Sequence, residues 1–242
     1  MKKNFIDASS GLVLLIKRLE RLFYTGTESY HGEDMQSDEM LSQMMLSTIA
    51  HYSERPLDFW EGTRDHDVSQ NLQALCRNLP RVHEPSRVLD FGCGPGRDLK
   101  QLTDLGYVAT GLDGCLPFCE MARAHSGCEV LHQNFIELDL PKRSFHGIFA
   151  NASLFHIHKS RLLDTLKTFY ESLRPDGIVF CSNPRGPNIE QMNELRYGNY
   201  MDVSGWSEMF CMAGFEPVEH YFRPPGFPRE EQPWLAMVWK KL

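Results

Sequence analysis

A glycine-rich turn between a predicted strand and a predicted helix constrains the fold more than any other feature of this sequence. Residues 88–98 read VLDFGCGPGRD, so an apolar run leads directly into Gly92, Gly94 and Gly96. Glycine lacks a Cβ atom, which allows the chain to turn sharply and a ligand to approach the backbone closely. In a doubly wound α/β sheet such a turn lies at the carboxyl end of the first strand, where these folds bind ligands.

The residues after this turn predict a mostly parallel sheet. From Ser86 onward, short apolar segments alternate with longer segments of helical periodicity, which is typical of a doubly wound α/β fold. The predicted strands are 87–91, 107–112, 129–132, 147–151 and 178–182, and the predicted helices are 97–105, 116–125 and 160–173.

The last third of the sequence adds a helix over 204–213 and two strands over 216–222 and 235–240. A proline-rich loop, not a helix, joins these two strands, so we expect an antiparallel pair at the edge of the sheet. The predicted fold class is therefore α/β: a doubly wound, mostly parallel, seven-stranded Rossmann-like sheet with an antiparallel edge strand.

The residues before the sheet predict helices. Apolar side chains at helical spacing predict amphipathic helices over 12–24 and 38–52, with a polar loop over 25–36 between them. The stretch 68–79 also looks helical and ends at Pro80. The second of these helices is rich in methionine, which suits either an adaptable binding surface or ordinary packing on the core.

Charge and cysteine content exclude several classes of protein. The formal net charge is −7 and no run of Lys or Arg is longer than two, so we expect no nucleic-acid partner. Seven cysteines without a CxxC pair favour reduced thiols over a disulfide framework, and zinc-finger spacing is absent, so no metal site is predicted. The apolar run 12–16 is too short for a secretory core or a membrane span, so we expect a cytoplasmic protein without membrane attachment.

Two classes of ligand compete for the glycine turn. A dinucleotide fold requires G-x-G-x-x-G, and the third glycine would fall on Arg97. Asp90 precedes the turn, and an acid there suits a ligand with an ammonium group better than one with two phosphates. Asp113 follows 21 residues after Gly92, where an acid can accept hydrogen bonds from ribose hydroxyls. Dehydrogenases have an acid at the same position, so Asp113 alone does not distinguish the two classes of ligand. Alternatively, Asp113 could cap the helix that follows.

With these residues the sequence resembles the class I S-adenosylmethionine-dependent methyltransferase superfamily, of the small-molecule type. Residues 89–96 look like motif I, which holds the methionine part of the cofactor, and Asp113 matches the ribose-binding acid of motif II. Residues 133–135 resemble the motif that contacts adenine. An acid is commoner there than Asn134, but an amide can also meet the adenine amino group.

Further segments extend the resemblance in both directions. Residues 151–156 look like the end of the family's fourth strand, beside the reacting methyl group, and 173–177 resemble the turn before the fifth strand. Upstream, 51–52 and 60–64 look like the N-terminal lid of small-molecule members, in which an aromatic covers the cofactor and an arginine reaches its carboxylate. For Arg64 the alternative is a surface arginine beside neighbouring aspartates.

The resemblance covers roughly 51–242 and implies S-adenosylmethionine as cofactor, with S-adenosylhomocysteine as product. We expect residues 1–80 to form an N-terminal helical segment and lid, and 81–242 to form the S-adenosylmethionine-binding methyltransferase domain. The cofactor-binding residues that it implies are Tyr52, Trp60, Arg64, Asp90, Gly92, Cys93, Gly94, Asp113, Gly114, Asn134, Phe135 and Asn151.

The sulfonium of the cofactor already activates the methyl group, so the protein has to align the nucleophile and keep water out. His156 is the candidate general base, because histidine titrates near neutral pH. The alternative is that His156 packs or hydrogen bonds without proton transfer. His158 could serve as base instead, but it stands nearer the start of the next helix.

Substrate contacts are expected after the fifth strand. Arg185 and Arg196 suit a carboxylate or phosphate, and Tyr197 and Tyr200 could wall an aromatic or apolar portion. Each could equally be structural. The loop 223–229 could border the same opening.

The leading hypothesis is an enzyme that methylates a small molecule at O, N or S. The alternative is a non-catalytic cofactor-binding or interaction protein that retains the methyltransferase fold. Its support is the N-terminal helical segment, a candidate surface for a partner or for a homodimer with a second copy of the chain.

Overall fold

The computed structural model describes the backbone of residues 33–242 and the side chains of 38–242. The helix expected over 12–24, the first part of the loop expected over 25–36 and the proposed N-terminal dimer surface lie outside the described residues. Contacts divide the chain into two compact units, Met1–Gln43 and Met44–Leu242. Helix α2 (Glu33–Glu54) begins before the expected residue 38, so the expected loop is wrong over 33–36. Glu, Met and Gln in this stretch are good helix formers, which the loop prediction ignored.

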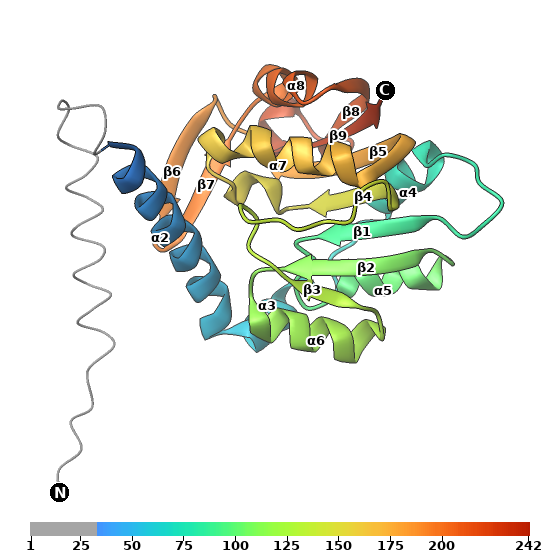
Figure 1. Ribbon diagram of the computed structural model, residues 1–242, viewed down its shortest axis with the longest axis horizontal. Coiled ribbons are helices and arrows are strands. Elements are labelled where there is room, and N and C mark those ends of the chain that lie inside the picture. The colour runs from blue at the N-terminus through green and yellow to red at the C-terminus, as the bar shows by residue number, and fades with distance from the viewer. Residues whose placement is uncertain (1–32) are drawn as a thin grey trace, which may run out of the picture. The chain divides into compact units, whose positions relative to one another are not determined.

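Within residues 44–242 a seven-stranded sheet has the order β3-β2-β1-β4-β5-β9-β8 (Figure 1). Strands β1 to β5 pair in parallel, and β9 runs antiparallel to both β5 and β8. The predicted fold class and the antiparallel pair are therefore confirmed. The strands are β1 (Arg87–Phe91), β2 (Val108–Asp113), β3 (Val130–His132), β4 (Phe145–Asn151), β5 (Leu173–Pro184), β8 (Phe215–Arg223) and β9 (Trp234–Lys241).

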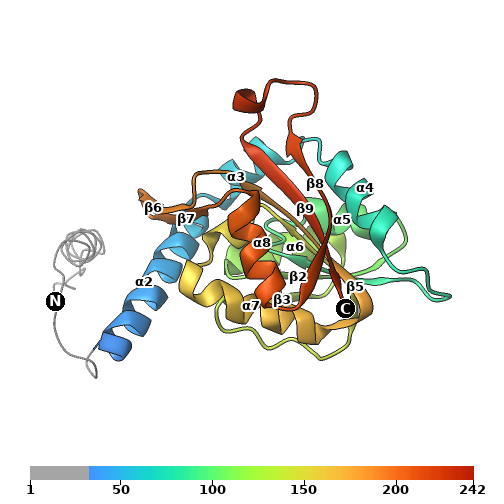
Figure 2. The same ribbon diagram turned by 90° about the horizontal axis from the view of Figure 1, so that it is seen from above.

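Helices cover both faces of this sheet (Figure 2). Successive side chains of a strand point to opposite faces, so Val88 packs in one apolar cluster while Leu89 and Phe91 pack in the other. The first cluster contains side chains of α4 (Ser69–Asn78), α5 (Arg97–Asp104) and α6 (Leu116–Ser126). The second contains side chains of α7 (Lys159–Ser172) and α8 (Val203–Met212). The alternation confirms a sheet that is buried on both sides.

Three local features differ from the sequence-based expectation. Strand β5 begins at Leu173, which pairs with Phe145, and residues 174–177 bulge out before pairing resumes. A short helix, α3 (Pro56–Thr63), follows α2 directly. Strands β6 (Ile189–Asn193) and β7 (Arg196–Tyr200) form a two-stranded sheet of their own. No helix in the described part of the chain combines the length and apolar character needed to cross a membrane.

Candidate active site

The glycine turn after β1 is fixed by its packing. The backbone N–H groups of Gly92 and Cys93 donate to the carbonyl oxygen of Leu112 at 2.8 and 3.0 Å, which joins the turn to β2. Gly92 has a φ of +76°, and a Cβ atom there would overlap the side chain of Ser153. A Cβ atom on Gly94 would meet only Phe59, at 3.7 Å. Gly92 is therefore required by the fold, whereas Gly94 leaves its backbone open to a ligand.

Asp113 lies at the carboxyl end of β2, directly beside this turn. Its Oδ2 accepts a hydrogen bond from the N–H of Gly94 at 2.9 Å, and its Oδ1 accepts one from the N–H of Cys115 at 2.8 Å. Burial raises the pKa of Asp113 to about 6, although these N–H groups oppose the shift. Each oxygen of a carboxylate has a further lone pair, so Asp113 can accept two more hydrogen bonds from a ligand.

A first cavity, of about 560 Å³ including its open mouth, lies beside Asp113. Aromatic rings form much of its wall: the ring centroid of Tyr52 lies 5.4 Å from that of Phe59 and 5.8 Å from that of Phe118. Gly114 and Phe135 also line this cavity. The cavity therefore combines an acceptor for hydroxyl groups with apolar walls for a ring system.

A second, larger cavity adjoins the first and encloses about 1830 Å³ including its open mouth. It lies at the carboxyl ends of β4 and β5, and residues of β7 and the start of the β8–β9 loop complete its wall. The residues that line both cavities are Tyr52, Phe59, Gly92, Gly94, Ala152 and His156. This shared set, called the junction below, places two binding spaces next to each other.

His156 occupies the junction with both ring nitrogens in use. It belongs to the short 3-10 helix Leu154–His156 after β4, and its Nδ1 lies 2.7 Å from the carbonyl oxygen of Tyr197. A carbonyl oxygen only accepts, so Nδ1 carries the proton. The Nε2 atom, 2.9 Å from the hydroxyl of Tyr52, therefore accepts a hydrogen bond from that hydroxyl. Burial lowers the pKa of His156 to about 4.

A part-buried chain of hydrogen bonds orients Asn151 at the end of β4. The Nδ2 atom of Asn71 donates to Oδ1 of Asn151 at 3.0 Å, and Nδ2 of Asn151 donates to Oδ2 of Asp98 at 2.9 Å. Asp98 also receives two hydrogen bonds from the guanidinium of Arg97. Arg97 in turn donates to the carbonyl of Thr63 at the end of α3. The amide of Asn151 is thereby held in one orientation at the edge of the second cavity.

The structure gathers most of the sequence-predicted site residues around the two cavities. Trp60 lines the second cavity with its ring 4.9 Å from that of His125. The predicted residues that line at least one cavity are Tyr52, Trp60, Gly92, Cys93, Gly94, Asp113, Gly114, Phe135, Asn151, His156, Arg196, Tyr197 and Tyr200.

Two predicted arginines lie elsewhere. Arg64 pairs with Glu61 at 3.0 Å and with Asp65 at 3.4 Å on the surface, which is the alternative that the sequence left open. Arg185 donates to the carbonyl oxygens of Gln232 and Arg229 and so holds the loop between β8 and β9. Neither side chain lines either of the two cavities, because each guanidinium already pairs with acceptors near it.

Two further predicted residues lie beside the cavities without lining them. Asp90 is buried beneath the glycine turn, and burial together with the nearby Asp98 raises its pKa well above the ordinary value. Asn134 uses its Oδ1 to accept a hydrogen bond from the N–H of Ile136 at 3.3 Å, so it caps its own turn. Neither side chain lines one of the two cavities, and the direct ligand contacts expected of them remain predictions.

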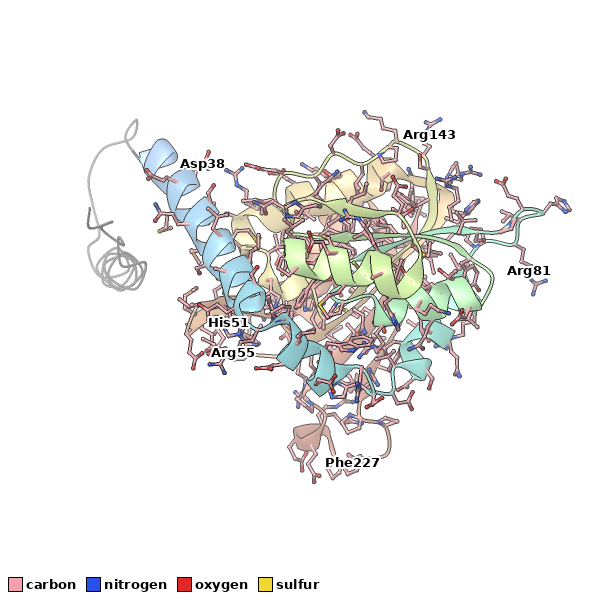
Figure 3. All side chains as sticks on the ribbon, turned by 90° about the horizontal axis from the view of Figure 1, so that it is seen from below. Asp38, His51, Arg55, Arg81, Arg143 and Phe227 are labelled. Atoms are coloured by element: carbon pink, nitrogen blue, oxygen red, sulfur yellow. The ribbon has the colours of Figure 1, made fainter. Side chains whose placement is uncertain are left out.

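Several lining residues were missed by sequence reasoning. Phe59 and Phe118 were not singled out, and Arg97 was considered only as a departure from the dinucleotide pattern. Arg97 and Asp98 directly follow the glycine turn, and this charged pair in the sequence could have indicated that both side chains border a cavity. The expectation that the loop 223–229 borders the opening is confirmed at its start, since Arg223 lines the second cavity. Farther along this loop Phe227 projects from the molecule (Figure 3).

The strand order, the glycine turn and the acid at the end of β2 define a class I S-adenosylmethionine-dependent methyltransferase fold. Residues 59–220 match the model of the methyltransferase domain family, and the chain belongs to this family. The chain therefore carries a methyltransferase domain.

Two curated relatives match part of the chain. An uncharacterized methyltransferase from Oceanobacillus iheyensis is 28% identical over 94 residues, which are 38% of this chain and 44% of that protein. A malonyl-acyl-carrier-protein O-methyltransferase from Enterobacter lignolyticus is 26% identical over 126 residues, which are 52% of this chain and 49% of that protein. The chain thus spans about half the length of the curated relatives it matches.

Solved structures share the fold at lower identity. The 1,6-didemethyltoxoflavin-N1-methyltransferase of Burkholderia thailandensis, solved with 1,6-didemethyltoxoflavin and S-adenosylhomocysteine, has a TM-score of 0.66 and 21% identity. That match covers 90% of this chain and 93% of the other. A 4+2 cyclase has a TM-score of 0.64 and 14% identity, with 82% of this chain and 96% of the other covered. At these identities the likeness extends to the fold alone.

Proposed function

We propose that the protein transfers a methyl group from S-adenosylmethionine, held in the first cavity, to a small-molecule nucleophile held in the second. One observation carries this proposal: the two cavities share a wall, the junction, at the carboxyl ends of the strands. When bound, the cofactor supplies an electrophilic methyl group on a sulfonium. The chain itself has to hold the nucleophile in line and exclude water.

The residues of the first cavity fit this cofactor. The oxygens of Asp113 retain lone pairs for the two ribose hydroxyls, and the open backbone at Gly94 leaves room for the methionine portion. The rings of Tyr52, Phe59 and Phe118 suit adenine or a sulfonium, because aromatic faces attract cations. Fixed dipoles and apolar walls of this kind keep water away from the reacting atoms.

We assign His156 the role of a positioning residue for Tyr52. Its Nε2 already accepts the hydroxyl hydrogen of Tyr52, and burial lowers its pKa to about 4, so it is a weak base at neutral pH. These two facts support hydrogen bonding without proton transfer over the general-base role. Tyr52, which reaches both cavities, would then present a fixed phenol to the junction.

The named relatives act on substrates of two kinds. One structural neighbour is an N-methyltransferase of 1,6-didemethyltoxoflavin, and one curated relative is an O-methyltransferase of malonyl-acyl-carrier protein. The second cavity, with polar side chains from β4, β5 and β7, supports a free small molecule as substrate here. The expected cytoplasmic location, the homodimer and the lid role of residues 1–80 remain predictions.

The test is product formation. Purified protein is incubated with S-adenosylmethionine and a panel of small carboxylates, phenols, amines and thiols, and S-adenosylhomocysteine and methylated product are measured together by mass spectrometry. We expect both to appear in equal amounts with at least one class of acceptor, and to be abolished in Asp113→Ala. Cofactor binding without S-adenosylhomocysteine formation from any class would refute catalysis and favour a non-catalytic binding protein.

A further inference from the structure

Arg196, on β7, lines the second cavity. Its guanidinium acts on the pKa of both Tyr52 and His156, which are the polar side chains of the junction. Its Nε is buried and has no hydrogen-bond partner among the described residues. Buried donors are almost always paired in native proteins, so an unpaired one that borders a cavity indicates an acceptor on the ligand.

The charges around the second cavity leave Arg196 uncompensated. Three arginines and two aspartates line it. Arg97 pairs with Asp98 at 2.6 Å. Arg223 donates to the backbone carbonyl of Asp67, although its Nε, like that of Arg196, has no partner among the described residues. Hydrogen bonds from Ser69 and, less strongly, the charge of Arg223 lower the pKa of the Asp67 carboxyl. Arg196 has no carboxylate partner among residues 38–242, although the whole chain carries a net charge of −7. A guanidinium in this setting favours a carboxylate or another anion.

The wall next to Arg196 is aromatic. The rings of Phe155 and Tyr200 lie 6.1 Å apart, and both line the second cavity together with Trp234. The hydroxyl of Tyr197 is engaged by Glu190 at 2.6 Å, so that tyrosine serves the hairpin rather than a ligand. Faces of this kind suit a flat apolar body attached to the anionic group.

The junction offers no good proton acceptor. Among the described residues that line both cavities, Tyr52 and His156 are the titratable ones. The Nε2 of His156 already accepts a hydrogen bond from the Tyr52 hydroxyl, and burial lowers the pKa of His156 to about 4. Burial raises the pKa of Tyr52, which keeps its phenol protonated. His66 and Asp67 border the second cavity only. A nucleophile that must lose a proton at the junction therefore finds no partner.

We infer that the substrate is an aromatic carboxylic acid and that its ionised carboxylate, held by Arg196, is the methyl acceptor. This inference rests on the proposed function. One carboxylate oxygen forms a bond to the methyl carbon while the carbon–sulfur bond breaks and its electron pair stays on sulfur. A methyl ester and S-adenosylhomocysteine result, and no proton has to be removed. Because the ester is neutral, Arg196 then holds the product less tightly than the substrate.

The first test compares acids with their neutral isosteres. Benzoate, phenylacetate and indole-3-acetate, each with its primary amide, are titrated into protein saturated with S-adenosylhomocysteine and followed by ligand-observed NMR. We expect at least one acid to bind tenfold or more tightly than its amide. Arg196→Gln should abolish this preference, and Arg196→Lys should keep part of it, because lysine retains the charge but not the fork of donors.

A matched control removes an arginine from the opposite end of the parallel strands. Arg174 lies near the start of β5 and pairs with Glu84 at 2.8 Å, so Arg174→Gln should leave the preference for acids unchanged. Affinity for S-adenosylhomocysteine and the thermal midpoint are measured for every variant. Equal values in Arg196→Gln and wild type show that the site is intact.

The second test identifies the bond that is made. With radiolabelled S-adenosylmethionine, a methyl ester releases volatile methanol in mild alkali, whereas methyl ethers and N-methyl groups do not. We expect alkali-labile label from the acid that binds. Amides that bind as tightly as acids, no acid bound at 10 mM, or alkali-stable label would overturn the carboxylate inference. In each of these cases S-adenosylhomocysteine formation with another acceptor would leave the proposed function standing.

Discussion

Replacement of His156 by glutamine should change how stability depends on pH. In the folded protein His156 stays neutral down to about pH 4, because burial opposes its charged form, whereas an ordinary histidine takes up a proton near pH 6.5. The unfolded chain therefore binds a proton between these values that the folded chain does not. The stability that depends on neutral His156 is present above pH 6.5 and is lost as the pH falls toward 4.

The size of this effect follows from the two pKa values. A difference between 6.5 and about 4, at about 1.36 kcal/mol per pH unit, corresponds to about 3 kcal/mol. Asp113 acts in the opposite direction, since its folded pKa of about 6 exceeds the ordinary 3.8 and adds stability as the pH falls. The wild-type curve alone therefore mixes two opposite contributions. The difference in unfolding free energy between wild type and His156→Gln isolates the histidine, because both proteins retain Asp113.

The assay is urea unfolding of wild type and His156→Gln at intervals from pH 7.5 to 4.5, followed by circular dichroism. Glutamine can donate to the Tyr197 carbonyl and accept from the Tyr52 hydroxyl, so the fold should persist. We expect the advantage of wild type to shrink by about 1.36 kcal/mol per pH unit below pH 6.5. Tyr52→Phe is the matched control: it should cost about 1–3 kcal/mol by leaving Nε2 unpaired, yet keep the pH slope. A difference between wild type and His156→Gln that stays constant with pH would refute a buried neutral imidazole.

Further predictions concern the turn, the buried amide chain and the cofactor acid. Gly92→Ala should destabilise the protein by at least about 2 kcal/mol more than Gly106→Ala in thermal unfolding. Both glycines have positive φ, but only at Gly92 does a Cβ atom overlap Ser153. Equal destabilisation by the two substitutions would contradict that clash. Asn71→Ala leaves the Asn151 carbonyl oxygen without its donor, while the Tyr221 hydroxyl keeps the Gln70 carbonyl as an acceptor, and should cost about 1–3 kcal/mol in urea unfolding. A loss below about 0.5 kcal/mol would show that the chain of hydrogen bonds contributes little. Affinity for S-adenosylhomocysteine, measured by calorimetry, should fall as the pH drops below about 6, where Asp113 gains a proton; an affinity that is the same at pH 7.5 and pH 5 would count against Asp113 as a hydrogen-bond acceptor.

The fold could be predicted because its signals are local. Strand β1 has the predicted bounds, since apolar residues at 88–91 run straight into glycines. Asp113 was placed by its distance in sequence from the turn, and the alternation of strands and helices gave the parallel order. Helix α3 and the β6–β7 hairpin were not predicted. Their sequences are short and mixed, and contacts with distant residues hold the hairpin, including a 2.7 Å hydrogen bond from Ser47 to the carbonyl of Leu195.

The direction of each arginine side chain could not be read from the sequence. Arg64 and Arg185 had the residue type and the position expected of ligand contacts, but neighbouring carboxylates and carbonyls take them up. Arg97 and Arg196 line the second cavity because α5 and β7 both border it. Such choices depend on which acceptors lie within a few ångströms after folding, and one sequence does not contain those distances.

Calorimetric titration of wild type and Asp113→Ala with S-adenosylmethionine, S-adenosylhomocysteine and NAD tests the cofactor site most directly. Each hydrogen bond to a charged acceptor contributes about 1.5–3 kcal/mol, so loss of two should weaken binding by about 100-fold or more. Asp104→Ala, which removes a surface acid paired with Lys100, should bind like wild type. We expect S-adenosylmethionine and S-adenosylhomocysteine to bind wild type and NAD not to bind. Binding of NAD alone, or equal affinity of wild type and Asp113→Ala for S-adenosylhomocysteine, would contradict the cofactor site described above.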